Sequence, residues 1–233
     1  MIPNKSVEIK MEPYPVEVDL SKTCLIIIDM QKDFVEKGGF GEMLGNDVQQ
    51  LQRAVEPCQK VLQAARDAGL LVIHTREGHR ADLSDIHMHK LHRPGSSKTV
   101  IGEPGPNGRI LVRGEPGHDI IESLYPKQGE PVIDKPGKGS FYATDLECIL
   151  KAKNMETIFV CGVTTEVCVH TTIREGNDRG YHCICVQDCC ASYREDFHKV
   201  AIDMIKAQGG IFGSVTDSKT VVEALGSLTN NSS

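Results

Sequence analysis

A stretch of twenty residues, 155–174, limits what this chain can fold into more than any other. Within it, residues 158–161 form a short apolar run of β-branched and aromatic side chains, which predicts a fully buried parallel strand. A glycine ends the run, and Thr164 or Thr165 is placed to cap a helix that covers about residues 166–179. A buried strand followed at once by a helix is the repeating unit of an α/β sheet protein.

The same stretch places Cys168 in the first turn of a helix, just beyond the carboxyl end of a strand. Ligands of open α/β sheets gather at that edge. The positive end of the helix dipole and its N–H groups favour a thiolate there. The alternative is that Cys168 is one more buried core cysteine, but its position after a strand and a threonine-rich turn favours a reactive thiol.

Strand-like and helix-like segments alternate along the rest of the chain. Expected strands cover residues 23–30, 70–75, 131–135, 181–186 and 211–215, and expected helices cover 46–68 (started or kinked by Pro57), 144–153, 195–207 and 218–225. This alternation predicts a parallel sheet covered on both faces, a single-domain Rossmann-like three-layer α/β sandwich. We expect an N-terminal arm at residues 1–19, the domain at 20–228 and a disordered tail at 229–233.

Composition narrows the function classes. The net charge of −6 argues against a nucleic-acid surface, and no run of 18 apolar residues predicts a membrane span. Nine cysteines in a chain of 233 residues without a signal-peptide pattern indicate a reduced, cytoplasmic protein. The histidines at 79, 87, 89 and 92 match no standard zinc spacing, so we expect loop residues and no metal.

Two further charged residues are expected at the carboxyl edge of the sheet. Asp29 ends the first central strand and Lys135 ends a short one, and an unpaired buried charge is costly. A nucleophilic thiol needs a base that takes its proton and returns it to a leaving amine. Asp29 is suited to that role, with Lys135 holding the carboxylate and favouring negative charge at sulfur. The alternatives are an Asp29 that caps a turn and a Lys135 that is solvated, a description that fits Lys138 better.

Phe34 and Phe40 lie beside glycines in the loop after the first strand, which suits a pocket wall, although local packing explains them equally well. Arg76 and Glu77 follow the second strand, where they either face the pocket or pair with each other.

Residues 25–31, 134–141 and 161–168 resemble the three signature stretches of the isochorismatase-like cysteine hydrolases, in the same order. The resemblance covers roughly residues 20–225. It implies a six-stranded parallel sheet, a homotetramer without a cofactor, and a catalytic triad of Asp29, Lys135 and Cys168. It also implies a cis peptide between Val163 and Thr164, and an oxyanion hole formed by the N–H groups of Thr164 and Cys168.

Within that family, residues 74–80, 102–106, 113–117, 174–180 and 208–214 resemble biuret amidohydrolases. This likeness implies that Gln208 contacts the substrate, although a Gln-Gly-Gly sequence also suits a helix C-cap. Triuret and ureidoacrylate hydrolases are the alternatives. Nicotinamidases fit less well, because their metal-binding Asp-x-His pattern is replaced here by Arg76-Glu77-Gly78.

The expected reaction is hydrolysis of a small ureide, biuret to allophanate and ammonia, through a thioester-type intermediate on Cys168. Two other classes of protein are the alternatives. An inactive binding protein on the same fold would lack a triad residue, and a nucleotide-binding domain would show a glycine fingerprint after the first strand, where Asp29-Met-Gln-Lys stands instead.

Overall fold

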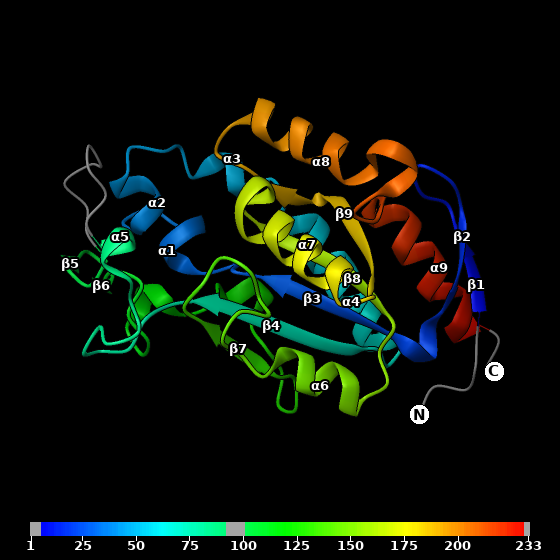
Figure 1. The fold of residues 1–233 in the computed structure, drawn as a ribbon, viewed down its shortest axis with the longest axis horizontal. Helices are drawn as coiled ribbons and strands as arrows, with labels where there is room; N and C mark the ends of the chain where they lie inside the picture. The colour runs from blue at the N-terminus through cyan, green and yellow to red at the C-terminus, as the bar shows by residue number, and fades with distance from the viewer. Residues whose placement is uncertain (1–5, 92–100, 231–233) are drawn as a thin grey trace.

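A six-stranded parallel sheet forms the centre of the computed structural model, which describes residues 6–91 and 101–230 (Figure 1). Its order is β10-β9-β8-β3-β4-β7, and every neighbouring pair is parallel. The strands are β3 (Thr23–Ile28), β4 (Leu71–Glu77), β7 (Val132–Lys135), β8 (Thr157–Val163), β9 (His182–Ala191) and β10 (Ser214–Thr216). The predicted fold class is confirmed.

Helices cover both faces of this sheet, as Figure 1 shows. One face packs against α4 (Val55–Asp67) and α9 (Ser218–Asn230), and the other against α6 (Leu146–Ala152), α7 (His170–Asp178) and α8 (Glu195–Gly210). Alternate residues of β3 enter the two cores, so all six are buried. This explains why the central strand is a continuous apolar run without polar alternation.

The N-terminal segment is a hairpin where the sequence suggested an arm. β1 (Ser6–Ile9) pairs antiparallel with β2 (Val16–Asp19), and Ile9 and Val18 are buried in the core beside α9. At the other end of the chain, residues 229 and 230 belong to α9, which runs beyond its predicted end, and residues 231–233 lie outside the described residues.

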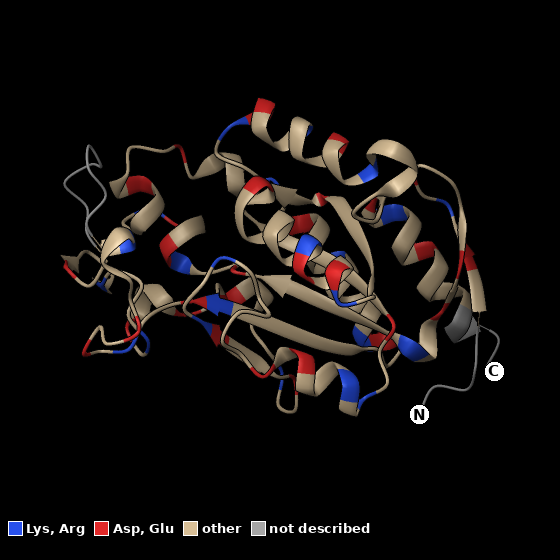
Figure 2. Ribbon diagram, viewed as in Figure 1, with Lys and Arg blue, Asp and Glu red and all other residues tan. Residues whose placement is uncertain are grey.

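Short elements surround the carboxyl edge of the sheet. They are α1 (Lys32–Val35), α2 (Phe40–Met43), α3 (Gln49–Gln52), α5 (Met88–Leu91), β5 (Pro104–Gly105), β6 (Gly108–Arg109), η2 (Pro116–His118) and η3 (Glu122–Leu124). A further short turn, η1 (Leu20–Lys22), leads into β3 at the opposite, amino edge. Ile101, Ile110 and Leu111 form a small core of their own beneath these loops. Figure 2 shows acidic and basic residues interspersed along the helices. Within residues 6–91 and 101–230, no helix combines the length and the apolar character needed to cross a membrane.

Two features at the end of β8 determine where the chain enters the turn that carries Cys168. The strand continues to Val163, two residues past its predicted end, and Gly162 has a φ of 117°. A Cβ at Gly162 would lie 2.0 Å from the carbonyl oxygen of Ile28, so only glycine lets β8 approach β3 this closely. The peptide between Val163 and Thr164 is cis, as the family resemblance implies.

Candidate active site

The structure brings Asp29, Lys135 and Cys168 together at the carboxyl edge of the sheet. Lys135 Nζ lies 2.7 Å from Asp29 Oδ2, and both side chains are fully buried. Cys168 Sγ and a carboxylate oxygen of Asp29 are within 4.8 Å of each other. Parallel strands end at one edge, which is why residues more than 100 positions apart in the sequence meet here.

Asp29 is held by both of its oxygens. It leaves β3 with a φ of 51°, a backbone conformation that Asp tolerates better than most residues. Thr75, on the neighbouring strand, donates its hydroxyl to Oδ1 at 2.7 Å, and Lys135 occupies Oδ2. The Asp29 side chain therefore forms a buried ion pair instead of capping a turn.

Glu77 is the site residue that the sequence reasoning placed least well. It is the last residue of β4 and is 1% exposed, and its Oε2 accepts a hydrogen bond from the Cys168 thiol at 3.4 Å. The alternative pairing with Arg76 is wrong, because Arg76 binds Asp134 and Asp119. Side chains two positions apart on a strand lie on the same face. Because Thr75 binds Asp29, an extension of β4 by two residues would have predicted Glu77 at the same site.

Three lysines surround the Glu77 carboxylate. Lys138 and Lys90 lie 2.6 and 2.8 Å from Oε1, and Lys135 lies 4.0 Å from Oε2. The description of Lys138 as a solvated lysine is therefore wrong, since its ammonium is paired with a buried carboxylate. Burial alone would raise the pKa of Glu77, but Lys138, Lys135 and Lys90 outweigh it and hold that pKa well below the usual range.

The Cys168 thiol is protonated in this environment. Burial raises its pKa well above the ordinary value, and Asp29 and Glu77 add to that, while Lys135 and Lys138 act in the opposite direction. The expectation that the helix terminus favours a resting thiolate is wrong, because the sulfur loses its hydration and faces two carboxylates. Lys135 remains an ammonium: burial would lower its pKa, but Asp29, Cys168 and Glu77 raise it above the usual range.

The turn after β8 differs in detail from the predicted helix start. Residues Thr165–Val169 form a π-helix that leads into α7, and Thr164 occupies the N-cap position without a capping bond from its side chain. The Thr164 carbonyl accepts hydrogen bonds from the backbone N–H groups of Val167 and Val169. Among the described hydrogen bonds, the Cys168 N–H does not donate to this carbonyl. The oxyanion hole assigned to Thr164 and Cys168 stays a prediction.

A cavity of about 260 Å³ opens onto Cys168. Its wall combines apolar and charged side chains: Phe34, Phe40, Leu44, Asn46, Glu77, Lys138, Val163, Thr164, Glu166, Val167, Cys168 and Tyr193. Phe34 and Phe40 also contact each other edge to face, with ring centroids 6.2 Å apart. Both expectations for these aromatics, pocket wall and local packing, therefore apply together.

Gln208 lies apart from this cavity. It is exposed, with a φ of 51°, where residues 207–209 break the helical backbone of α8. This backbone matches the alternative of a helix end better than a substrate contact within the same chain.

The donor atoms of Asp29, Glu77 and Cys168 lie within 4.8 Å of one another, close enough to share a metal ion. The Lys135 ammonium already contacts both carboxylates, and it supplies the positive charge that a cation would bring. Among the described residues, His79, His87 and His89 belong to no cluster of this kind, and His92 lies outside them. His79 instead contacts Asp85 at 3.2 Å.

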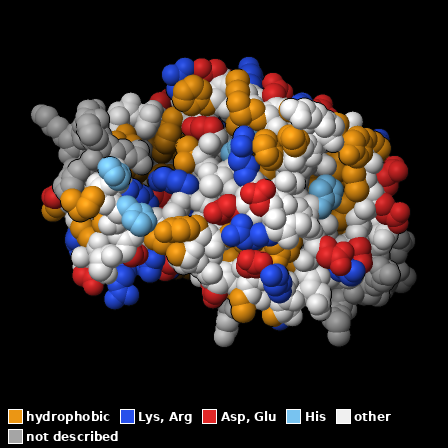
Figure 3. Space-filling model, viewed as in Figure 1, with side chains coloured by type: hydrophobic (Ala, Val, Ile, Leu, Met, Phe, Trp, Pro, Cys, Tyr) orange, Lys and Arg blue, Asp and Glu red, His pale blue; other side chains and the backbone are white. Residues whose placement is uncertain are grey.

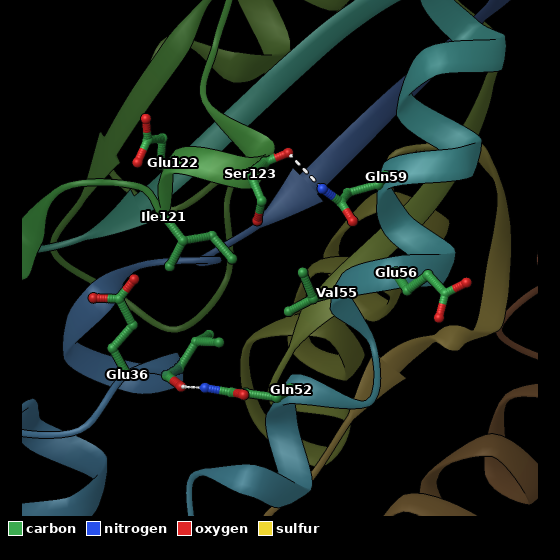
Figure 4. A pocket seen from close by; sticks show the side chains of 9 residues that line it. Glu36, Gln52, Val55, Glu56, Gln59, Ile121, Glu122 and Ser123 are labelled. Carbon is green, nitrogen blue, oxygen red and sulfur yellow. Dashed lines mark hydrogen bonds between the residues drawn. The ribbon is translucent and has the colours of Figure 1, made fainter.

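A roomier hollow of about 650 Å³ lies between α4 and η3 (Figure 4). Its charged side chains are Glu36, Glu56 and Glu122, and its lining includes no cysteine, lysine or histidine. Gln52 and Gln59 donate to backbone carbonyls of Val35 and Ser123 across it. Its one hydroxyl, on Ser123, has no histidine or lysine in the lining to act as its base, so the smaller cavity at Cys168 is the candidate site.

Known proteins are similar to this chain in sequence and in fold. The family model of the isochorismatase domain matches residues 23–219. The ureidoacrylate amidohydrolase RutB of Acinetobacter baylyi is 29% identical over 218 residues, 92% of this chain and 88% of that protein. RutB of Methylorubrum extorquens strain AM1 is 32% identical over 186 residues, 78% and 75% of the two chains. A solved cysteine hydrolase from Pseudomonas syringae pv. phaseolicola 1448A superposes with a TM-score of 0.76 at 32% identity, covering 91% of this chain and 95% of that one.

Proposed function

The chain belongs to the isochorismatase domain family, and from that premise we propose that it is a cysteine-dependent amidohydrolase acting on a C–N bond of a small ureide. The observation that carries the proposal is a buried thiol, Cys168, which faces a small cavity beside two buried carboxylates and a buried lysine. A nucleophile, a base and a group that orients the base are the parts that covalent amide hydrolysis requires.

The proposed reaction has two stages. In the first, Cys168 sulfur bonds to the ureide carbonyl carbon while its proton passes to Asp29 and then to the departing nitrogen, so that the C–N bond breaks and ammonia leaves. In the second, water gives a proton to Asp29 and adds to the thioester, the S–C bond breaks, and the proton returns to sulfur. In both stages the N–H groups of Thr164 and Cys168 are assigned to the oxyanion.

Two carboxylates, Asp29 and Glu77, lie near the thiol, and Glu77 accepts its hydrogen bond. Three lysines surround Glu77 and hold its pKa well below the usual range, so protonation of that carboxylate is strongly disfavoured. Asp29 shares a single lysine, at 2.7 Å. We therefore assign Glu77 to positioning the thiol and the lysines, and Asp29 to moving the proton.

Biuret is our first candidate substrate and ureidoacrylate the alternative. The names of the curated relatives favour ureidoacrylate, which carries a carboxylate. The cavity wall favours a neutral ureide: Lys138 is already paired with Glu77, and Glu166 adds a carboxyl group whose Oε2 is buried without a hydrogen-bond partner. An amide N–H would satisfy that oxygen, whereas a second carboxylate would be repelled by it once ionised.

The deciding experiment measures ammonia release from biuret, triuret, ureidoacrylate, nicotinamide and N-carbamoylsarcosine. We expect turnover of at least one ureide, with biuret the fastest. Cys168→Ala should abolish it without unfolding the chain, and Cys148→Ala, which removes an exposed thiol, should leave the rate unchanged. Activity of Cys168→Ala within tenfold of the unmodified protein would exclude the covalent mechanism. Failure of every substrate would favour the inactive binding protein.

We also propose that the chain self-associates, as the family resemblance implies. Figure 3 shows apolar side chains gathered in the region of α8. Phe197, Val200 and Met204 are about half exposed, at 45%, 51% and 47%, and their helical spacing puts them on one face. A second copy that covers this face would remove them from water. Light scattering of the unmodified protein and of Val200→Glu tests this, and a monomer in both would exclude it.

A further inference from the structure

A second cluster of reactive side chains lies on the opposite face of β8 from Cys168. Its members are Cys58 of α4, Cys161 of β8 and Cys189 of β9, and all three are fully buried. Their sulfur atoms lie within 4.8 Å of one another. Cys58 also donates to the backbone carbonyl of Cys189 at 3.1 Å. Three thiols from three elements therefore point at one location.

A backbone irregularity is what puts Cys189 there. Val160 pairs with Cys185, but Gly162 pairs with Cys190, so the single residue Cys161 lies opposite four residues of β9. A regular strand would put Cys189 on the same face as Cys183 and Cys185. The three extra residues of β9 reverse which face of the sheet its later side chains take. Cys189 therefore lies in the core that contains Cys161, and Cys190 lies in the core on the other face of the sheet. Bulges commonly redirect a side chain in this way.

The bulge is fixed by its own contacts. Asp188 accepts the backbone N–H of Ser218 at 2.7 Å and also binds the Ser218 hydroxyl, which ties the bulge to the start of α9. The surroundings of the cluster are apolar, with side chains from α4, α9 and β3 in the same core. Rigid, converging sulfur ligands in an apolar setting are a preorganised site for a soft ion.

We propose that Cys58, Cys161 and Cys189 form a trigonal three-sulfur binding site for a soft monovalent cation, with Cu(I) as the ion that suits it best. Thiolate ligands select soft ions such as Cu(I). Structural zinc sites are almost always four-coordinate, and within residues 6–91 and 101–230 this cluster has three donors and no fourth. Binding displaces the thiol protons to solvent, because the thiolate is the form of cysteine that ligates a metal.

The site is independent of the proposed hydrolase chemistry, because it uses none of the residues at Cys168. Its test uses the full chain with Cys148→Ala and Cys168→Ala, which remove the exposed thiol and the thiol at the cavity. This background is refolded anaerobically with Cu(I), desalted and analysed for metal, and its thiolate-to-copper absorption in the near ultraviolet is recorded. We expect about one copper per chain, the absorption band, and a melting temperature that rises with copper concentration.

Matched variants separate this cluster from ordinary thiol binding. Cys161→Ala and Cys189→Ala should each lose the copper and the absorption band. Cys185→Ala should keep both, although its sulfur lies 3.8 Å from Cys190 on the other face of the sheet. If an alanine variant does not fold, Cys58→Ser replaces it. Copper retained by Cys161→Ala, copper lost equally by Cys185→Ala, or less than half an equivalent in the background would overturn the proposal. Zinc bound equally tightly would overturn the choice of ion.

Discussion

Lys135→Met is the substitution that most directly tests the site. Methionine keeps the length of the side chain and removes its charge. The ammonium lies 2.7 Å from Asp29 and 4.0 Å from Glu77, with no exposure to solvent. Removing one partner of a buried ion pair typically costs about 3–5 kcal/mol, because the other charge is left buried and unpaired. For a chain of this size the melting temperature should fall by roughly 6–20 °C.

The catalytic effect of Lys135→Met has a separate cause. Lys135 lowers the pKa of the Cys168 thiol against the effect of burial, so its loss should make the thiolate rarer. We expect ammonia release to slow by at least about 100-fold, on the order of 3 kcal/mol in the barrier. The pH at which iodoacetamide alkylates Cys168 rapidly should rise.

Lys138→Met is the matched control, three positions away. The Lys138 side chain is about one-third exposed, and its carboxylate partner Glu77 keeps Lys90 at 2.8 Å when Lys138 is removed. We expect a loss of less than about tenfold in rate, since the pairing of Glu77 is shared.

A double variant keeps the test informative if Lys135→Met folds poorly. Asp29→Asn in the same chain removes the stranded charge, so it should recover most of the lost stability and none of the activity. Urea unfolding, steady-state ammonia release and the alkylation profile are measured on all four proteins. Equal losses in the two lysine variants, or a normal alkylation profile in Lys135→Met, would refute the assignment of Lys135.

Glu77→Gln should lower kcat by about 100-fold, because it removes the negative charge that accepts the thiol's hydrogen bond and leaves Lys90 and Lys138 without a carboxylate partner. A kcat within threefold of the unmodified protein would contradict this. Dialysis against a chelator should leave hydrolysis unchanged, and a loss restored by zinc or manganese would show that the carboxylates hold a metal. Gly162→Ala should destabilise the fold by about 3 kcal/mol, because its Cβ would meet the Ile28 carbonyl, whereas Gly129→Ala, with open space around it, should cost about 1 kcal/mol in urea unfolding. Burial raises the pKa of Cys183 to about 12. The unfolded state therefore loses this proton at a lower pH, and the free energy of unfolding should fall as the pH rises above about 8.5. An equally steep fall in the free energy of unfolding of Cys183→Ala would refute this.

The sequence was sufficient for the fold and for part of the site because both follow from one regularity. Parallel buried strands end at a common edge, so polar residues that follow β3, end β7 and follow β8 are expected at that edge. Asp29, Lys135 and Cys168 are such residues. Their contact also depends on β8, β3, β4 and β7 being consecutive in the sheet, an order that the sequence pattern alone does not give.

Glu77 and Lys90 could not be placed in the same way. The sequence suggested that β4 ends at Thr75, two residues early, which put Glu77 in a loop. Lys90 reaches Glu77 from α5, a four-residue helix within a segment of irregular structure. Its position depends on tertiary contacts of that loop and leaves no periodic signal in the chain. The hairpin β1–β2 escaped prediction for a related reason, since its two strands have four residues each.

The protonated state of Cys168 depends on the balance between burial and the surrounding charges, which a sequence pattern does not give. Two carboxylates and three lysines around the sulfur carry a net charge of about +1, which a thiolate would cancel, while loss of hydration favours the neutral thiol. In the proposed step the proton moves from Cys168 to Asp29 as the oxyanion forms. One negative charge disappears from Asp29 as another appears on the substrate, so the net charge of the buried site stays constant. A thiol that ionises only as its target is attacked avoids the cost of a buried resting thiolate. The site thus needs a nearby base and a fixed lysine more than it needs a helix dipole.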